Sequence, residues 1–348
     1  MIKLMIVDDS LFMRRILRDA LKEDDDIIVV GEARNGKEAL EKIPILKPDV
    51  ITLDIEMPIM DGITTLKHIV DKYSIPVVMI SSLTEDGAYH TLKALEIGAI
   101  DFITKPKNIF EMSSEFIKYE ITDKIKAAAV SKVKKDYSIK FKPKITGQED
   151  LVLNKNVEYD YIIAIATSTG GPRALQDVIP LFPKNINGTI LVVQHMPANF
   201  TKSLADRLNS LSHVVVKEGE EGETLKRGYC YIAPGDYHMR VVPKGNQNII
   251  RLSKEPPIKG LRPAADLLME SVAEIEGYKK IGVIMTGMGS DGAKGIVKIK
   301  NANGYTIAQD ETTSVVFGMP KSAIKTKHVD KIVPLNNIAH EIMSIVGV

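Results

Sequence analysis

The N-terminal part of the sequence alternates short apolar runs with stretches of helical periodicity, and this alternation constrains the fold more than any other feature. Each apolar run precedes a segment with the spacing of an amphipathic helix; the runs are KLMIVDD, IIVVGEA, PDVITLDI, PVVMISS and IDFITKP. Repeated strand–helix units with short connections predict a parallel sheet covered by helices. We therefore expect a doubly wound α/β domain, whose ligands bind outside the carboxyl ends of the strands.

The alternation resumes at Tyr159, after a lysine-rich stretch without periodicity. Apolar runs such as YIIAIA, GTILVVQ and KKIGVIMTG are interleaved with helical segments, of which LRPAADLLMESVAEI is the clearest. Between residues 228 and 253, β-rich segments lack intervening helices, so we expect a small antiparallel insertion there. The sequence predicts two doubly wound parallel-sheet domains, flavodoxin-like over residues 1–127 and Rossmann-like over residues 156–348, with a linker over residues 128–155.

Composition excludes several classes of function. The net charge is +1, with 46 basic and 45 acidic residues, so no overall field favours nucleic acid or an anionic membrane. The single cysteine, Cys230, excludes an intramolecular disulfide and a thiolate-rich metal site. No apolar run reaches the ~18 residues of a membrane span. We expect a soluble cytoplasmic monomer that neither binds nucleic acid nor inserts into a membrane.

Polar residues with complementary chemistry end the predicted strands of the first domain. Asp8 and Asp9 follow the first strand, Asp54 the third, Ser81 the fourth and Lys105 the fifth. Carboxylates brought together repel one another, and Mg²⁺ is a cation that such a set can hold. A hydroxyl and an ammonium group beside them suit the oxygens of a phosphoryl group. Each residue alone is more commonly a cap or turn residue, but the set predicts a phosphoacceptor site.

The stretch YIIAIATSTGGP, from Tyr161 to Pro172, contains a candidate nucleophile. Its apolar run predicts a buried strand, and the glycines and the proline predict a tight turn into a helix. Ser168 then lies at the carboxyl edge of a parallel sheet, beside the N–H groups that begin a helix. Capping of the helix or phosphate binding at the turn are alternatives. The stretch matches neither GxGxxG, GxxxxGK[ST] nor GxSxG.

Two further strand ends carry a histidine and an aspartate. GTILVVQ ends before His195, and KKIGVIMTG ends in the turn GMGSDG, which contains Asp291. With Ser168 they predict nucleophilic acyl transfer, in which histidine takes the hydroxyl proton and the carboxylate orients the imidazole. His195 as a core histidine and Asp291 as the N-cap of the following helix are the alternatives. The chain order Ser–His–Asp argues against an α/β-hydrolase.

The strand-end residues of the first domain resemble the receiver domain of bacterial response regulators over about residues 1–125. The resemblance implies phosphorylation at Asp54. It implies a Mg²⁺ site made by Asp8, Asp9, Asp54 and the backbone carbonyl of Glu56. It also implies switch residues that respond to the phosphoryl group, namely Ser81, Phe102 and Lys105.

The second half resembles the chemotaxis protein-glutamate methylesterases of the CheB family in the motifs TSTGGP, VVQHMPANFTKSLADRL, YIAPGDYHM, LRPAADLLMESVA and MTGMGSDGAKG. The resemblance implies that Ser168 is the nucleophile, His195 its base and Asp291 the partner of His195. It implies that the oxyanion and substrate are held by Thr169, Gly170, Gly171 and Met288. The chain departs from the family at Ala166 and Thr167, where the family usually has glycine and alanine, and this departure concerns the oxyanion geometry.

The same resemblance implies a reaction and its partners. The substrates are glutamate γ-methyl esters of chemoreceptors, with methanol as product, and glutamine side chains that are deamidated. A chemotaxis histidine kinase is the phosphodonor, Mg²⁺ is needed at the receiver alone, and phosphorylation activates the esterase. A phosphorylation-dependent binding module without hydrolase activity is the alternative. A DNA-binding output lacks a basic recognition helix in the second half.

Overall fold

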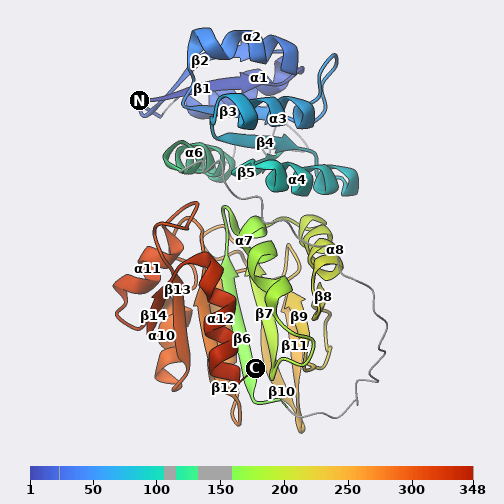
Figure 1. Cartoon of the computed structure of the whole chain (residues 1–348), viewed down its shortest axis with the longest axis vertical. Coiled ribbons are helices and arrows are strands. Elements are labelled where there is room, and N and C mark those ends of the chain that lie inside the picture. The colour runs from blue at the N-terminus through green and yellow to red at the C-terminus, as the bar shows by residue number, and fades with distance from the viewer. Residues whose placement is uncertain (23, 106–114, 132–158, 348) are drawn as a thin grey trace. The chain divides into compact units, whose positions relative to one another are not determined.

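The computed structural model describes residues 1–22, 24–105, 115–131 and 159–347. The chain divides into two compact units, Met1–Tyr137 and Ser138–Val348, each built around its own parallel sheet (Figure 1). This confirms the expectation of two parallel α/β domains. The first residues of the predicted linker belong to helix α6, which runs to Val130. The rest of that linker, from residue 132 onward, lies outside the described residues.

The N-terminal unit contains a 5-stranded sheet in the order β2-β1-β3-β4-β5, in which all neighbouring strands are parallel. Helix α1 contacts α6, whereas α3 contacts both α2 and α4, so helices cover both faces of the sheet. The elements are β1 (Ile2–Val7), α1 (Leu11–Leu21), β2 (Ile27–Ala33), α2 (Gly36–Leu46), β3 (Val50–Asp54), α3 (Gly62–Lys72), β4 (Val77–Ser81), α4 (Glu85–Ile97), β5 (Asp101–Thr104) and α6 (Glu115–Val130).

Side-chain caps set where the first helices of this unit begin. Each cap residue accepts a hydrogen bond from a backbone N–H of the first turn, which would otherwise lack a partner. The caps are Ser10 for α1, Asn35 for α2, Asp61 for α3 and Thr84 for α4. They fix the loops that leave the carboxyl ends of β1 and β3, and these loops carry the acidic residues of the predicted phosphoacceptor site.

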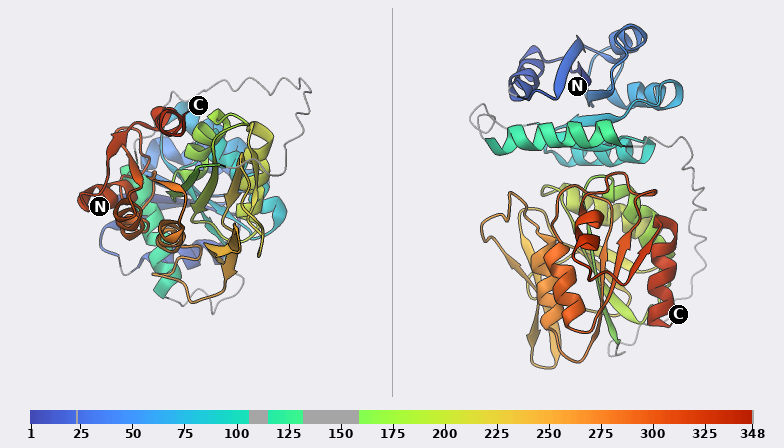
Figure 2. Two further views of the ribbon diagram at one scale, coloured as in Figure 1. Left: turned by 90° about the horizontal axis from the view of Figure 1, so that it is seen from below. Right: turned by 90° about the vertical axis from the view of Figure 1, so that its left-hand side faces the viewer.

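The C-terminal unit contains a 7-stranded sheet in the order β14-β13-β12-β6-β7-β9-β8, also parallel throughout. Strands β6 and β7 are buried along their whole length, because helices cover both faces of the sheet (Figure 2). The elements are β6 (Tyr161–Thr167), α7 (Gly171–Val178), η1 (Ile179–Leu181), β7 (Gly188–Gln194), α8 (Phe200–Leu211), β8 (Val215–Glu218), β9 (Tyr229–Ile232), β10 (His238–Lys244), β11 (Gln247–Ser253), α9 (Ala265–Glu274), β12 (Lys279–Ile284), α10 (Ala293–Asn301), β13 (Tyr305–Gln309), α11 (Met319–Lys325), β14 (Lys331–Val333) and α12 (Leu335–Val346).

The antiparallel insertion is smaller than the sequence predicts. Among the described strands, only β10 and β11 form an antiparallel hairpin, whereas β9 is a parallel strand between β7 and β8. The prediction was wrong for β9 because the connection from β8 contains no helix. That connection is held instead by β11, since the N–H of Gly222 donates to Ile250 at 2.8 Å and the N–H of Leu225 donates to Asn248 at 2.9 Å.

Strand order explains where ligands bind in each unit. The chain moves from β6 to β7 in one direction, and then returns to place β12 on the other side of β6. Such a reversal opens a crevice at the carboxyl ends of the strands. In the N-terminal unit the same reversal lies between β1 and β3. No helix within the described ranges combines the length and apolar character that crossing a membrane requires.

Candidate functional site

The predicted acidic cluster forms at the reversal of the first sheet. Ligand oxygens of Asp8, Asp9 and Asp54 all lie within 4.8 Å of one another. Asp8 and Asp54 are buried, while Asp9 is exposed. Burial, reinforced by the charge of Asp54, raises the pKa of Asp8 to about 6, and burial also raises the pKa of Asp54. Lys105 opposes this effect, because its Nζ lies 2.7 Å from Oδ2 of Asp54.

This donor set fits a divalent cation. Within the described residues, Oδ2 of Asp8 is buried without a hydrogen-bond partner, and its nearest cation is Nζ of Lys105 at 3.8 Å. A buried, unpaired carboxylate oxygen is costly unless a charge compensates it, and Mg²⁺ takes such oxygens together with water and phosphate oxygens. The backbone N–H groups of Ile55 and Glu56 donate to Asp54. The predicted use of the Glu56 carbonyl as a ligand stays a prediction.

Two of the three predicted switch residues, Ser81 and Phe102, lie in buried contacts. The Ser81 hydroxyl faces α4, where it donates to the carbonyl of Gly87 at 3.2 Å and accepts from Thr91 at 2.7 Å. The Phe102 ring is buried, and Nζ of Lys124 lies 5.2 Å from its centroid. Both side chains would have to leave these contacts to act as switches, so their switching roles stay predictions.

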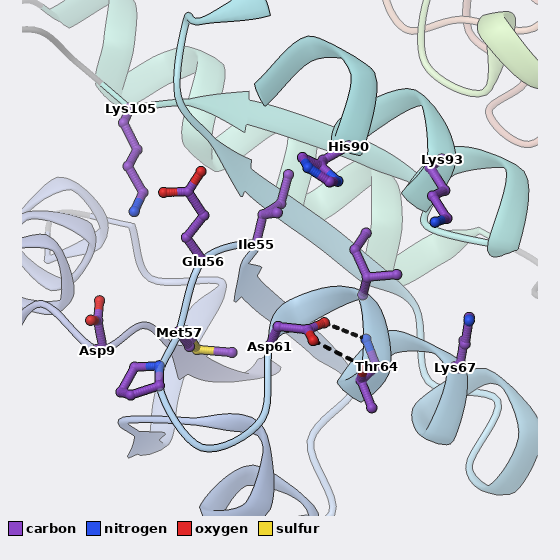
Figure 3. Close-up of a pocket in the computed structure, with 12 residues that line it drawn as sticks. Asp9, Ile55, Glu56, Met57, Asp61, Thr64, Lys67, His90, Lys93 and Lys105 are labelled. Carbon is purple, nitrogen blue, oxygen red and sulfur yellow. Dashed lines mark hydrogen bonds between the residues drawn. The ribbon is translucent and has the colours of Figure 1, made fainter. Parts of the chain in front are cut away.

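A cavity of about 870 Å³ adjoins the acidic cluster. Asp9 and Lys105 lie at one end of it, and Lys67 and Lys93 lie at the other (Figure 3). The loop after β3 forms its floor, with Glu56, Met57, Pro58 and Asp61 among the lining residues. The acidic cluster can therefore be reached through this cavity.

In the second unit, Ser168 occupies the predicted turn between β6 and α7. Its N–H donates to the carbonyl of Thr286 at 3.0 Å, and its own carbonyl accepts the N–H of Gly171 at 2.7 Å. Gly170 has φ 76°, in the left-handed region that favours glycine. The expected strand, turn and helix are thus observed, and Ser168 lies at the carboxyl edge of the sheet.

His195 directly follows strand β7, which neighbours β6 in the sheet. Thr167 of β6 pairs with Gln194 of β7, and the N–H of His195 donates to the carbonyl of Thr167 at 3.2 Å. Ser168 and His195 are therefore the next residues after paired positions on adjacent strands. Within the described part of the chain, the Ser168 hydroxyl makes no hydrogen bond to the imidazole. Such catalytic hydrogen bonds commonly tighten only when substrate binds.

Asp291 binds the imidazole of His195. Its Oδ2 lies 2.8 Å from Nε2 of His195, and both side chains are buried. This leaves Nδ1 as the nitrogen that could accept a proton from Ser168. Burial would raise the pKa of Asp291, but the hydrogen bond and charge of His195 and the N–H groups of Ala265 and Asp266 outweigh it, so this pKa is lowered.

Asp291 is not the N-cap of the helix that follows it. Helix α10 begins at Ala293 with Gly292 at its N-cap and no side-chain cap. The carboxylate instead accepts the N–H groups of Ala265 at 2.6 Å and Asp266 at 3.0 Å, at the start of α9. The capping alternative is therefore wrong for α10. The helix that Asp291 does cap is one that packs beside it from another part of the chain.

The predicted oxyanion donors differ in their availability. The N–H of Gly171 is used within the turn, because it donates to the carbonyl of Ser168, and the role of Gly171 at the site stays a prediction. Within the described residues, the N–H groups of Gly170 and Met288 have no acceptor. Gly287 lies against Ser168, since a Cβ atom added there would be 2.8 Å from the Ser168 Cβ. Thr169 is buried, and its carbonyl accepts the Thr286 hydroxyl at 3.0 Å.

The departure at Thr167 is accommodated in the turn. Its hydroxyl is buried and donates to the carbonyl of Thr286 at 3.1 Å. Gly171 leaves the necessary space, because a Cβ atom there would lie 2.2 Å from Oγ1 of Thr167. Thr167 thus adds a link between the ends of β6 and β12 instead of crowding Ser168. Ala166 is buried in β6.

Sequence reasoning missed two polar residues that connect these strand ends. The Gln194 side chain donates to the carbonyls of Ser168 and His195. The carbonyl of Thr286 accepts a hydrogen bond from the N–H of Ser168. Both follow or end apolar, buried strands, where an amide or hydroxyl is uncommon. A polar residue at such a position is the signal that could have found them.

Comparison with known proteins finds relatives over both units. Residues 163–342 match the family model described as CheB methylesterase, and residues 4–116 match the response regulator receiver domain. A Pyrococcus abyssi protein named protein-glutamate methylesterase/protein-glutamine glutaminase is 48% identical over 98% of this chain and 93% of its own length. A Bacillus subtilis protein of the same name is 45% identical over 99% of both. The crystal structure of the Thermotoga maritima CheB methylesterase catalytic domain is 46% identical, with TM-score 0.53, and covers 54% of this chain and 100% of that one.

Proposed function

The chain belongs to the CheB methylesterase family, and from this premise we propose that Ser168, His195 and Asp291 hydrolyse glutamate γ-methyl esters of chemoreceptors. The chain is a protein-glutamate methylesterase/protein-glutamine glutaminase with a receiver domain, and it acts in chemotaxis adaptation. One observation carries the choice of residues. The hydrogen bond between His195 and Asp291 lies at the edge where Ser168 leaves the adjacent strand.

In this mechanism Ser168 attacks the ester carbonyl while Nδ1 of His195 takes the hydroxyl proton. The negative charge on the tetrahedral intermediate faces the N–H groups of Gly170 and Met288. His195 then gives its proton to the leaving methoxide, which departs as methanol and leaves a glutamyl ester on Ser168. Water attacks this ester with the help of the same base, and the products are a glutamate carboxylate and free Ser168.

Asp291 keeps the imidazole ready for both steps. Its lowered pKa keeps it ionised at neutral pH, so it fixes the tautomer that carries hydrogen on Nε2 and compensates the imidazolium charge. Three backbone N–H groups hold the carboxylate itself, those of Ala265, Asp266 and Gly292. The base is therefore oriented by an anion that cannot easily rotate away.

Deamidation of glutamine uses the same residues with a poorer leaving group. The γ-amide carbon is attacked by Ser168, and ammonia leaves only after His195 has protonated the nitrogen. The amide reaction should therefore depend more strongly on His195 than the ester reaction does. The proposed substrates lie on the cytoplasmic part of chemoreceptors, where we place the enzyme as a monomer.

The receiver domain supplies the control. Asp54 accepts the phosphoryl group from a chemotaxis histidine kinase, and Asp8, Asp9, Asp54 and the Glu56 carbonyl hold Mg²⁺ when it is bound. That cation would offset the charge of the phosphoryl oxygens. Lys105, which already pairs with the Asp54 carboxylate, pairs with the phosphoryl group. Ser81 gives up its hydrogen bonds with Gly87 and Thr91 and binds the phosphoryl group instead, and the Phe102 side chain then changes its conformation.

Methanol release from methylated receptor membranes tests the proposal. Wild type should release methanol, faster with Mg²⁺ and a small phosphodonor, and Ser168→Ala should not. Asp54→Ala should lose the stimulation by the phosphodonor but keep the unstimulated rate, which separates the control of the enzyme from its chemistry. If Ser168→Ala and wild type bound receptors equally in a phosphorylation-dependent way and neither released methanol, the binding-module alternative would replace the esterase.

A further inference from the structure

Gln194 connects the proposed nucleophile to the proposed base. It is the last residue of β7, directly before His195, and its side chain is buried. Its Nε2 lies 3.1 Å from the carbonyl oxygen of Ser168 and 3.2 Å from that of His195. A carbonyl oxygen can only accept, so the amide nitrogen must face both, and a primary amide has two N–H bonds to give.

The link begins where the regular pairing of the strands ends. Thr167 and Gln194 are the last paired residues of β6 and β7. Ser168 then enters a turn that leads into α7, while His195 enters the loop before α8. The two segments continue into different loops from this point, so the Gln194 amide ties together backbone beyond the last paired residues of the sheet.

The surroundings of the amide are arranged around it. A Cβ atom at Gly171 would lie 2.1 Å from Oε1 of Gln194, so any side chain there would displace the amide. Within the described residues, Oε1 is buried and has no hydrogen-bond partner. An unpaired buried acceptor destabilises a fold. Glutamine is therefore a poor choice for stability alone, and its two donated hydrogen bonds are the feature that distinguishes it from an apolar residue of equal length.

Resting on the proposed function, we infer that Gln194 is a positioning residue of the esterase, whose amide fixes the backbone of Ser168 relative to that of His195 so that the two side chains can exchange a proton once substrate binds. It does not contact the substrate, so it acts on the turnover step rather than on binding. A displacement of about 1 Å between reacting groups can cost about 10²-fold in rate. The inference adds a residue to the proposed mechanism without changing its chemistry.

The test compares full-length variants with a matched control. Gln194→Met keeps the length of the side chain and removes both donors, while Gln194→Glu keeps its shape and places an acceptor against two carbonyls. Gln176→Met is the control, because Gln176 of α7 is also a buried glutamine with an unpaired side-chain atom, Nε2, and lies outside the proposed machinery. A fluorophosphonate that labels Ser168 counts active sites by intact mass.

We expect Gln194→Met to lower kcat per titrated site by roughly 10- to 100-fold, with KM for methylated receptor changed less than twofold. Gln194→Glu should lose at least as much, and Gln176→Met should behave as wild type. Wild-type kcat per titrated site in Gln194→Met, or an activity loss fully matched by fewer titrated sites, would overturn the inference. Wild-type enzyme without labelling at Ser168 would instead overturn the proposed function.

Discussion

Asp291 and Asp266 cap two neighbouring helices in a reciprocal way: Asp291 caps α9, and Asp266 caps α10. The carboxylate of Asp291, just before α10, accepts the N–H of Asp266 in α9 at 3.0 Å. The carboxylate of Asp266 accepts the N–H of Gly295 in α10 at 2.8 Å. Burial raises the pKa of Asp266, and the neighbouring charge of Asp291 raises it further. This exchange fixes the carboxylate that orients His195 to two packed helices.

Asp291→Asn should therefore separate charge from structure. The amide oxygen can still accept an N–H from the start of α9, but the charge that compensates the imidazolium is lost. We expect a fall in methanol release approaching ~10⁴-fold, with a melting temperature closer to wild type than that of Asp291→Ala. Asp291→Ala removes the cap as well, which typically costs about 1 kcal/mol. An active Asp291→Asn enzyme would contradict the assigned role.

A proline at Met288 tests the oxyanion donor. Met288→Pro removes one backbone N–H, and loss of a single such donor typically lowers kcat ~10²- to 10³-fold. Met288→Ala is the matched control, because it keeps the N–H and removes only the side chain. Methanol release should fall in the proline variant and stay within a few-fold of wild type in the alanine variant. Equal rates in the two variants would exclude this donor.

The acidic cluster predicts a pH-dependent stability. In the folded state the pKa of Asp8 is raised from 3.8 to about 6. The contribution of Asp8 to the free energy of unfolding is therefore fully present below pH 3.8 and is lost as the pH rises through 6. At neutral pH this loss corresponds to about 3 kcal/mol. Without Mg²⁺, Asp8→Asn should raise the melting temperature at pH 7.5 and leave it unchanged near pH 4, as measured by calorimetry.

The same variant tests the cation site. Mg²⁺ binds the folded state, so it should raise the melting temperature of wild type at pH 7.5 by mass action. Asp8→Asn should lose most of this increase. If Asp8→Asn melted below wild type in EDTA at pH 7.5, the ionised Asp8 carboxylate would not be destabilising. If Asp8→Asn responded to Mg²⁺ as wild type does, Asp8 would not be a ligand of the cation.

Phosphorylation should act through Asp54 alone. With Mg²⁺ and a small phosphodonor, methanol release by wild type should rise, and a tenfold rise requires only about 1.4 kcal/mol of differential stability. Asp54→Ala should show no rise while keeping the unstimulated rate. Asp71→Ala, on the exposed side of α3, is the control and should respond fully. Stimulation of Asp54→Ala would place the phosphoacceptor elsewhere.

Local periodicity was sufficient to predict the parallel domains, because strands buried on both faces, such as β6 and β7, have continuous apolar sequences. It was not sufficient for β9. A parallel strand usually follows a helix, whereas the connection before β9 is stabilised by hydrogen bonds to β11, more than twenty residues further along the chain. Such a contact leaves no periodic signal in either segment.

The strand ends predicted which side chains meet, but not how they are held. Ser168 and His195 follow paired residues, and this outcome could be expected from a parallel sheet. The donors to the Asp291 carboxylate could not, because the nearest helix in sequence is α10, whereas N–H groups at the start of α9 donate to it. The use of the Gly171 N–H within the turn also depends on backbone geometry that residue types do not specify.

The most direct test of the central claim is whether Ser168 and His195 act as one unit. Methanol release should be measured for Ser168→Ala, His195→Gln and the double variant, each with the melting temperature of wild type. Residues that act together in one step lose their function together, so the double variant should be no slower than the slower single variant. Losses that multiply in the double variant would contradict the account.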